Sequence, residues 1–202
     1  TEGRLALRRL FAQIALQYGD TEAVLKLMPA READHILLAQ VYALRKEWPS
    51  VLTLDIPERG DNAFLGLAAR VEAYIALGRL EQAEQEIAAM KERFQKQQSP
   101  IAYRSVQLSE ARLAAERGQF GWVREHFQQA PQGVPAYVLF SILGRAAEVS
   151  NQPENAAKLY AQAYALAPAS QREQFAEKLA KYHEPLPEIK KLERKWQGTV
   201  GL

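Results

Sequence analysis

Residues 140–168 read FSILGRAAEVSNQPENAAKLYAQAYALAP and predict two helices packed against each other. On either side of a break at residues 150–152, apolar residues recur at spacings of three and four, so each half presents one apolar helical face. Pro153 suits the first turn of the second helix. Gly144 lets the two helices approach closely beside Tyr160. One such hairpin cannot bury its apolar face alone, so we expect others along the chain.

Residues that tolerate the left-handed conformation mark the turn of each expected hairpin. The clear markers are Gly78, Gly118 and Asn151, and weaker copies of the pattern precede them at Gly19 and Lys46. Successive markers lie 27, 32, 40 and 33 residues apart. The short first interval fits second helices of only about two turns in the first two hairpins. The long interval fits an extended second helix after Gly78.

This pattern of large and small residues resembles the tetratricopeptide-repeat (TPR) family, or a closely related helical-hairpin repeat, whose period is ~34 residues. The resemblance covers the chain as far as Pro168, with the first two units degenerate. It implies an all-α fold, a right-handed superhelical stack of about five antiparallel helix pairs (an α-solenoid). The fifth unit matches almost completely, at Phe140, Leu143, Gly144, Ala147, Ala156, Tyr160, Ala163 and Pro168.

We expect residues 1–202 to form a single domain. Residues 1–60 hold the two degenerate hairpins, the first with Phe11 and Ala12 in its pattern, and residues 61–168 hold the three clearer ones. Residues 169–202 contain a capping helix with one apolar face, a short final helix over 189–196 and a tail.

Composition excludes several functional classes. The chain has no cysteine, so it has no disulfide or thiolate chemistry. A net charge of +2, without interleaved aromatic and basic residues, gives no reason to expect nucleic acid. No apolar run approaches the ~20 residues of a membrane-spanning helix. We expect a cytoplasmic protein, and its start at Thr1 rather than methionine is what a fragment of a longer protein would show.

The sequence holds no pattern typical of a catalytic or metal site. No histidine has another histidine or a cysteine at metal-ligand spacing, and no nucleophile-elbow motif occurs. The carboxylates Glu81, Glu84 and Glu86 fit the start of a helix, where acidic residues are favourable. We therefore expect no cofactor, no metal and no catalysis. An enzyme with a helical-toroid active site is the remote alternative.

The resemblance implies that the first helix of each unit lines a concave face that contacts a protein or peptide partner. Carried over to this chain, it implies contacts from residues one turn apart on those helices. The residues are Arg9, Gln13 and Gln40 in the degenerate units, Glu72 in the third, Ser105, Leu108 and Arg112 in the fourth, and Ser141 and Arg145 in the fifth.

Arg112 and Arg145 occupy equivalent places in adjacent units, where two guanidinium groups would grip an acidic partner. The alternative is that each pairs within its own helix, Arg112 with Glu116 and Arg145 with Glu148, for only ~0.2–0.5 kcal/mol per pair. TPR proteins that clamp a C-terminal carboxylate use paired Lys and Asn, and the departure from that pattern here puts chaperone tails in doubt.

We therefore expect a protein-interaction module or scaffold. The alternative is a regulatory domain at the inner face of a membrane, in a larger membrane-anchored protein such as an intramembrane protease. It is suggested by Lys190, Lys191, Arg194, Lys195 and Trp196, a basic and aromatic cluster typical of a membrane edge. A homodimer is a further expectation, through the apolar residues Ile36, Leu44, Leu65 and Ile75.

Overall fold

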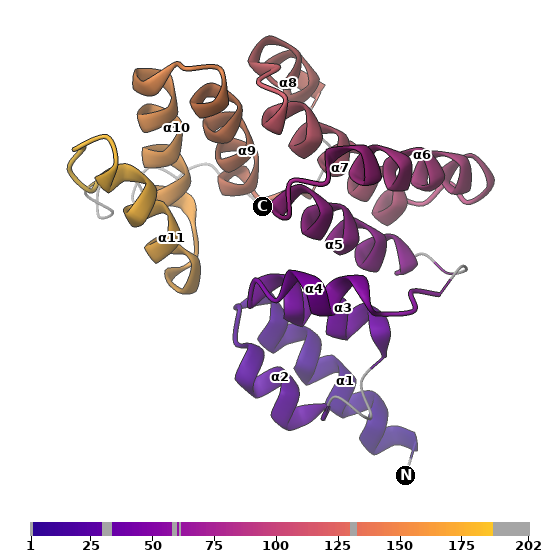
Figure 1. The fold of residues 1–202 in the computed structure, drawn as a ribbon. Coiled ribbons are helices and arrows are strands. Elements are labelled where there is room, and N and C mark those ends of the chain that lie inside the picture. The colour runs from indigo at the N-terminus through magenta and orange to yellow at the C-terminus, as the bar shows by residue number, and fades with distance from the viewer. Residues whose placement is uncertain (1, 30–33, 58–59, 61, 130–132, 188–202) are drawn as a thin grey trace, which may run out of the picture. The chain divides into compact units, whose positions relative to one another are not determined.

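The computed structural model describes residues 2–29, 34–57, 60, 62–129 and 133–187 (Figure 1). Over these residues the chain forms eleven α-helices and one short 3₁₀-helix, with no strand, so the all-α prediction is confirmed. The elements are α1 (Glu2–Gln17), α2 (Thr21–Leu27), α3 (His35–Leu44), α4 (Trp48–Leu52), α5 (Ala63–Ala76), α6 (Leu80–Lys96), α7 (Pro100–Glu116), α8 (Phe120–His126), η1 (Phe127–Gln129), α9 (Ala136–Val149), α10 (Pro153–Leu166) and α11 (Ala169–Ala180).

Five pairs of consecutive helices are joined by a turn of the same length, three residues. The pairs are α1 with α2, α3 with α4, α5 with α6, α7 with α8, and α9 with α10. The middle residue of every turn has a positive φ, and these residues are Gly19 (74°), Lys46 (58°), Gly78 (71°), Gly118 (68°) and Asn151 (57°). They are the five turn markers of the sequence, so the predicted hairpin turns are confirmed.

Backbone hydrogen bonds in the five turns are equivalent. In the third turn, Gly78 N–H donates to the Ile75 carbonyl at 3.0 Å, and Arg79 N–H donates to the Tyr74 carbonyl at 2.8 Å. This pair of bonds is the Schellman motif, which satisfies carbonyls at the end of a helix. The Arg79 carbonyl then accepts from Ala83 N–H at 3.1 Å, so one residue both ends the first helix and begins the second. The same three bonds recur in the other four turns.

Each turn also brings equivalent small or apolar residues of its two helices into the interior. On the first helix these are Ala12, Ala39, Val71, Ala111 and Gly144, all buried. On the second helix they are Val24, Val51, Ala83, Val123 and Ala156, each fully buried. Side chains of this size allow paired helices to lie close together, which explains why large residues are absent from these positions.

Contacts within the chain define two compact units, residues 1–113 and 114–202, whose boundary falls inside α7. In the first unit, Phe64, Leu67 and Met90 are the largest side chains of a core formed by α3 to α7. In the second unit, Tyr160 packs with Phe175 and Leu179 of α11, so the predicted apolar face of the last helix is buried. That residues 1–202 form a single domain stays a prediction.

The first helix differs from the expectation. Phe11 is 50% exposed, so the prediction that it packs within the first hairpin is wrong, whereas Ala12 is fully buried there. Phe11 belongs to an exposed apolar stripe that the sequence analysis missed, made of Leu7, Leu10, Phe11 and Ile14 on α1 and of Tyr18 directly after it.

The apolar residues expected at a dimer seam are mostly covered. Of the four, Leu44 is exposed, whereas Ile36, Leu65 and Ile75 are partly buried, and Ile75 packs against the core of the first unit. The predicted helix over 189–196 lies outside the described residues. None of the described helices combines the length and the apolar character needed to cross a bilayer.

We predict that Gly144→Ala destabilises the chain by about 1–2 kcal/mol, because overpacking outweighs the gain in helix propensity. A Cβ at this position would lie 2.7 Å from the Tyr160 ring, and that ring is fully buried. Gly121→Ala is the matched control, since it meets nothing within 4 Å and lies in α8. It should leave stability equal or raise it by up to ~1 kcal/mol. Urea unfolding of both variants measures the difference, and equal effects would contradict the close crossing.

The turns give a second pair of variants. Lys46→Gly should stabilise the chain by about 0.5–1 kcal/mol, because a lysine side chain is strained at positive φ and glycine is not. Gly78→Ala should destabilise it by about 1 kcal/mol for the same reason, although an added Cβ meets no neighbour there. Unfolding free energies that move in the same direction for both variants would contradict this interpretation.

Candidate functional site

The first helices α5, α7 and α9 carry charged residues that pair between helices. In the first unit, Arg112 on α7 forms an ion pair with Glu72 on α5, and both are predicted partner-contact residues. The prediction that Arg112 pairs with Glu116 on its own helix is wrong. Glu116 is instead paired with Arg145 of α9.

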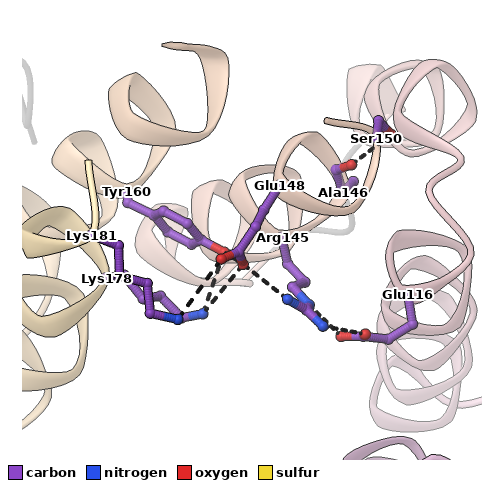
Figure 2. A network of polar contacts seen from close by, with 8 residues as sticks. All are labelled: Glu116, Arg145, Ala146, Glu148, Ser150, Tyr160, Lys178 and Lys181. Atoms are coloured by element: carbon purple, nitrogen blue, oxygen red, sulfur yellow. Dashed lines mark hydrogen bonds and ion pairs between the residues drawn. The ribbon is translucent and has the colours of Figure 1, made fainter. Parts of the chain in front are cut away.

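Arg145 on α9 makes three side-chain hydrogen bonds to two carboxylates (Figure 2). Its Nε and Nη2 each donate to a different oxygen of Glu116 at 2.8 Å, a two-point contact between planar groups. Its Nη1 donates to Glu148 Oε2 at 2.9 Å, so the predicted pair with Glu148 is confirmed. Hydrogen bonding to Glu116 raises the pKa of Arg145 further above its usual value, despite partial burial.

Glu148 is the centre of a larger network. The buried Tyr160 hydroxyl donates to Glu148 Oε2 at 2.9 Å. The ammonium groups of Lys178 and Lys181 lie 3.8 Å and 3.9 Å from its two oxygens. Figure 2 shows the carboxylate between Arg145 on one side and the two lysines on the other. Lys178 and Lys181 come from α11 or directly follow it, and Tyr160 comes from α10, so the network joins all three helices.

The shape of the α9–α10 hairpin explains why Tyr160 reaches Glu148. Gly144 and Glu148 are one turn apart on α9, and the Tyr160 ring lies against the side-chain-free position of Gly144. The ring is therefore directed along α9, with its hydroxyl at the next turn, where it donates a hydrogen bond to Glu148. A residue that permits close packing also sets the geometry of the polar network.

Burial and hydrogen bonds shift the titration of this network. Burial opposes the ionisation of Glu148, but hydrogen bonds from Arg145 and Tyr160 outweigh it and hold the pKa of Glu148 below its usual value. Burial, together with donation to Glu148, raises the pKa of Tyr160. Burial lowers the pKa of Lys178, although the Glu148 carboxylate opposes the shift. Near neutral pH, Glu148 is ionised and Tyr160 is protonated.

The other predicted partner-contact residues do not join this network. Arg9 and Gln13 are exposed on α1. The Gln40 side chain donates to the Ile36 carbonyl of its own helix at 3.2 Å. Ser105 is only 5% exposed and offers almost no surface to a partner, whereas Leu108 and Ser141 are partly exposed.

Sequence reasoning missed the polar roles of Tyr160, Lys178 and Lys181. Tyr160 was expected only to fill space beside Gly144. The available signal was the pair of lysines three residues apart at the end of α11, a spacing that puts both on one face of a helix.

Among the described residues, no group of three or more histidine, aspartate or glutamate side chains is arranged to hold a metal ion. The network instead presents alternating cations and carboxylates, an arrangement suited to binding charged groups of another molecule. The chain matches no protein-family model, no curated protein and no solved structure. Function must therefore be inferred from the residues themselves.

The low pKa of Glu148 predicts a specific pH dependence of stability. A carboxyl whose pKa is lower in the folded chain stabilises the fold above its unfolded pKa of ~4.3, and this contribution is lost as pH falls through the folded value. The difference in unfolding free energy between the wild type and Glu148→Gln should therefore shrink below pH ~4.3. Tyr160→Phe should give an intermediate curve, because it removes one of the two hydrogen bonds that lower the pKa.

Urea unfolding at a series of pH values, from neutral to acid, measures these curves. Wild-type and Glu148→Gln curves that stay parallel through the acid range would contradict the assignment of the shift to Glu148.

Proposed function

We propose that this chain is a non-catalytic module that binds a protein or peptide partner on the surface formed by the first helices of a TPR-like stack. The observation that carries the proposal is the placement of charged pairs between first helices, Glu72 with Arg112 and Glu116 with Arg145. The five equivalent hairpin turns support the stack, because hairpins with the same turn place the first helix of each in an equivalent position.

The internal ion pairs are compatible with partner binding. The side chains of Arg112 and Glu72 are 30% and 27% exposed to solvent, and that of Arg145 is 41% exposed. Ion pairs this accessible to water contribute only about 0–1 kcal/mol to stability. A partner that supplies equivalent charges can therefore share or replace these contacts at little cost in folding free energy.

The same pairs orient the charged groups before a partner arrives. Arg145 is held by three hydrogen bonds to two carboxylates, so its guanidinium has little freedom left to lose on binding. Immobilising a long side chain at an interface costs about 0.5–1.5 kcal/mol, and a side chain that is already held avoids much of that cost.

Two groups of the network suit fixed electrostatic contacts. A general acid or base works best with a pKa near the operating pH. The pKa of Glu148 is shifted down and that of Tyr160 is shifted up, so both move away from neutrality, whereas burial moves the pKa of Lys178 toward it.

The alternative of a regulatory domain in a membrane-anchored protein depends on residues 190–196, which lie outside the described residues. It stays a prediction. The gene sequence that follows Leu202 discriminates, since an apolar run long enough to span a bilayer would favour the alternative and a stop codon would remove it.

The proposal is tested by selecting binders from a displayed library of peptides from the source organism. The bound surface is then mapped by hydrogen exchange. We expect a saturable binder that protects α5 and α7. The double variant Glu72→Arg with Arg112→Glu keeps an ion pair but reverses its direction, so it should fold normally and lose binding by roughly tenfold or more.

The matched control is Arg70→Glu with Glu86→Arg, which reverses the ion pair between α5 and α6 and should leave partner binding unchanged. Absence of any saturable binder, or protection confined to the second helices, would count against the proposal. Equal loss of binding in both reversed variants would show that the pair of Glu72 with Arg112 has no special role.

A further inference from the structure

The network around Glu148 carries more positive than negative charge. Arg145, Lys178 and Lys181 converge on it, whereas Glu116 and Glu148 are its two carboxylates, which leaves one positive charge in excess. Arg145 makes three short hydrogen bonds to the two carboxylates. The two lysines lie farther from Glu148, at 3.8 Å and 3.9 Å, so the excess charge is least compensated there.

Glu148 does not satisfy the donors of these lysines. The separations of 3.8 Å and 3.9 Å exceed the range of about 2.7–3.2 Å for an N–H···O hydrogen bond. Lys178 Nζ also lies 3.4 Å from the Tyr160 hydroxyl, a long contact. Each ammonium group has three N–H donors, so both lysines have hydrogen-bonding capacity left for a ligand.

The side chains of Lys178 and Lys181 differ in how firmly they are held and in how exposed they are, and this difference suits a binding site. Lys178 Nζ lies 4.8 Å from the centre of the Tyr160 ring, a cation–π contact with a side chain that is itself fully buried. Lys178 is thus held in place. The Lys181 side chain is 64% exposed, so an incoming group can reach it from solvent. One fixed cation therefore lies beside one accessible cation on the same helical face.

We propose that Lys178 and Lys181 bind a carboxylate from an acidic segment of a protein partner, with Glu148 as the internal carboxylate that keeps the ammonium groups together and limits their affinity. This inference deepens the proposed function and rests on it. A single excess positive charge matches one carboxylate. A phosphate group would bring a charge of about −1.5 to −2 close to Glu148 and is matched less well.

The test measures fluorescence anisotropy of a short labelled peptide of alternating glutamate and alanine, blocked at both ends. The same peptide with glutamine is the reference. Lys181→Gln and Lys178→Gln should each weaken binding about fivefold. Glu148→Gln should strengthen it about fivefold, because it removes the competing charge while its amide oxygen still accepts from Tyr160. Lys158→Gln, an exposed position on α10, makes the same change in net charge and should leave binding unchanged.

Circular dichroism and urea unfolding establish that each variant is folded, and Lys181→Gln, at an exposed position, keeps the test valid if Lys178→Gln is unstable. The inference is overturned if the glutamate peptide binds no better than the glutamine peptide, if Lys158→Gln weakens binding as much as Lys181→Gln, or if Glu148→Gln fails to strengthen it. Competition by inorganic phosphate as effective as that by the unlabelled peptide would also overturn it. A library-selected partner that still protects α5 and α7 would then leave the proposed function standing.

Discussion

In each hairpin, one turn residue in the left-handed conformation determines how the two helices meet. It lets the residue after it close the first helix and open the second, so only three residues separate two antiparallel helices. Helices joined so tightly must lie close together, and the interior positions beside each turn accept only small or medium side chains. The small residues, the close crossing at Gly144 and the reach of Tyr160 to Glu148 all follow from that constraint.

Charged residues on the first helices form ion pairs with residues of other first helices. Arg112 and Glu116 lie one turn apart on α7, and each reaches a partner on another helix, Glu72 or Arg145. Charged side chains therefore connect helices that are distant in sequence, while the apolar core connects the two helices of a hairpin. The first kind of contact is partly exposed to water and the second is buried, so the apolar core contributes more to stability than the ion pairs do.

The hairpin turns and the all-α fold were predictable because they depend on local residues. Gly19, Lys46, Gly78, Gly118 and Asn151 mark helix ends by their own conformational tolerance. Pairing of Arg112 was not predictable, because Glu116 and Glu72 offer similar small energies and only the packing of α5 against α7 decides between them. Exposure of Phe11 was missed because a repeat pattern specifies which residues face a neighbour without specifying that a neighbour is present.

Connections within a hairpin and connections between hairpins differ in how much they tolerate insertion. Within all five hairpins the connection has three residues, and each is fixed by a backbone bond or a left-handed conformation. The connections that follow each hairpin vary from two residues, before α11, to ten residues, before α5. One added residue at Gly78 would separate α5 from α6, whereas an insertion before α5 has more room as long as it spares Ile56, which is buried in the core of the first unit.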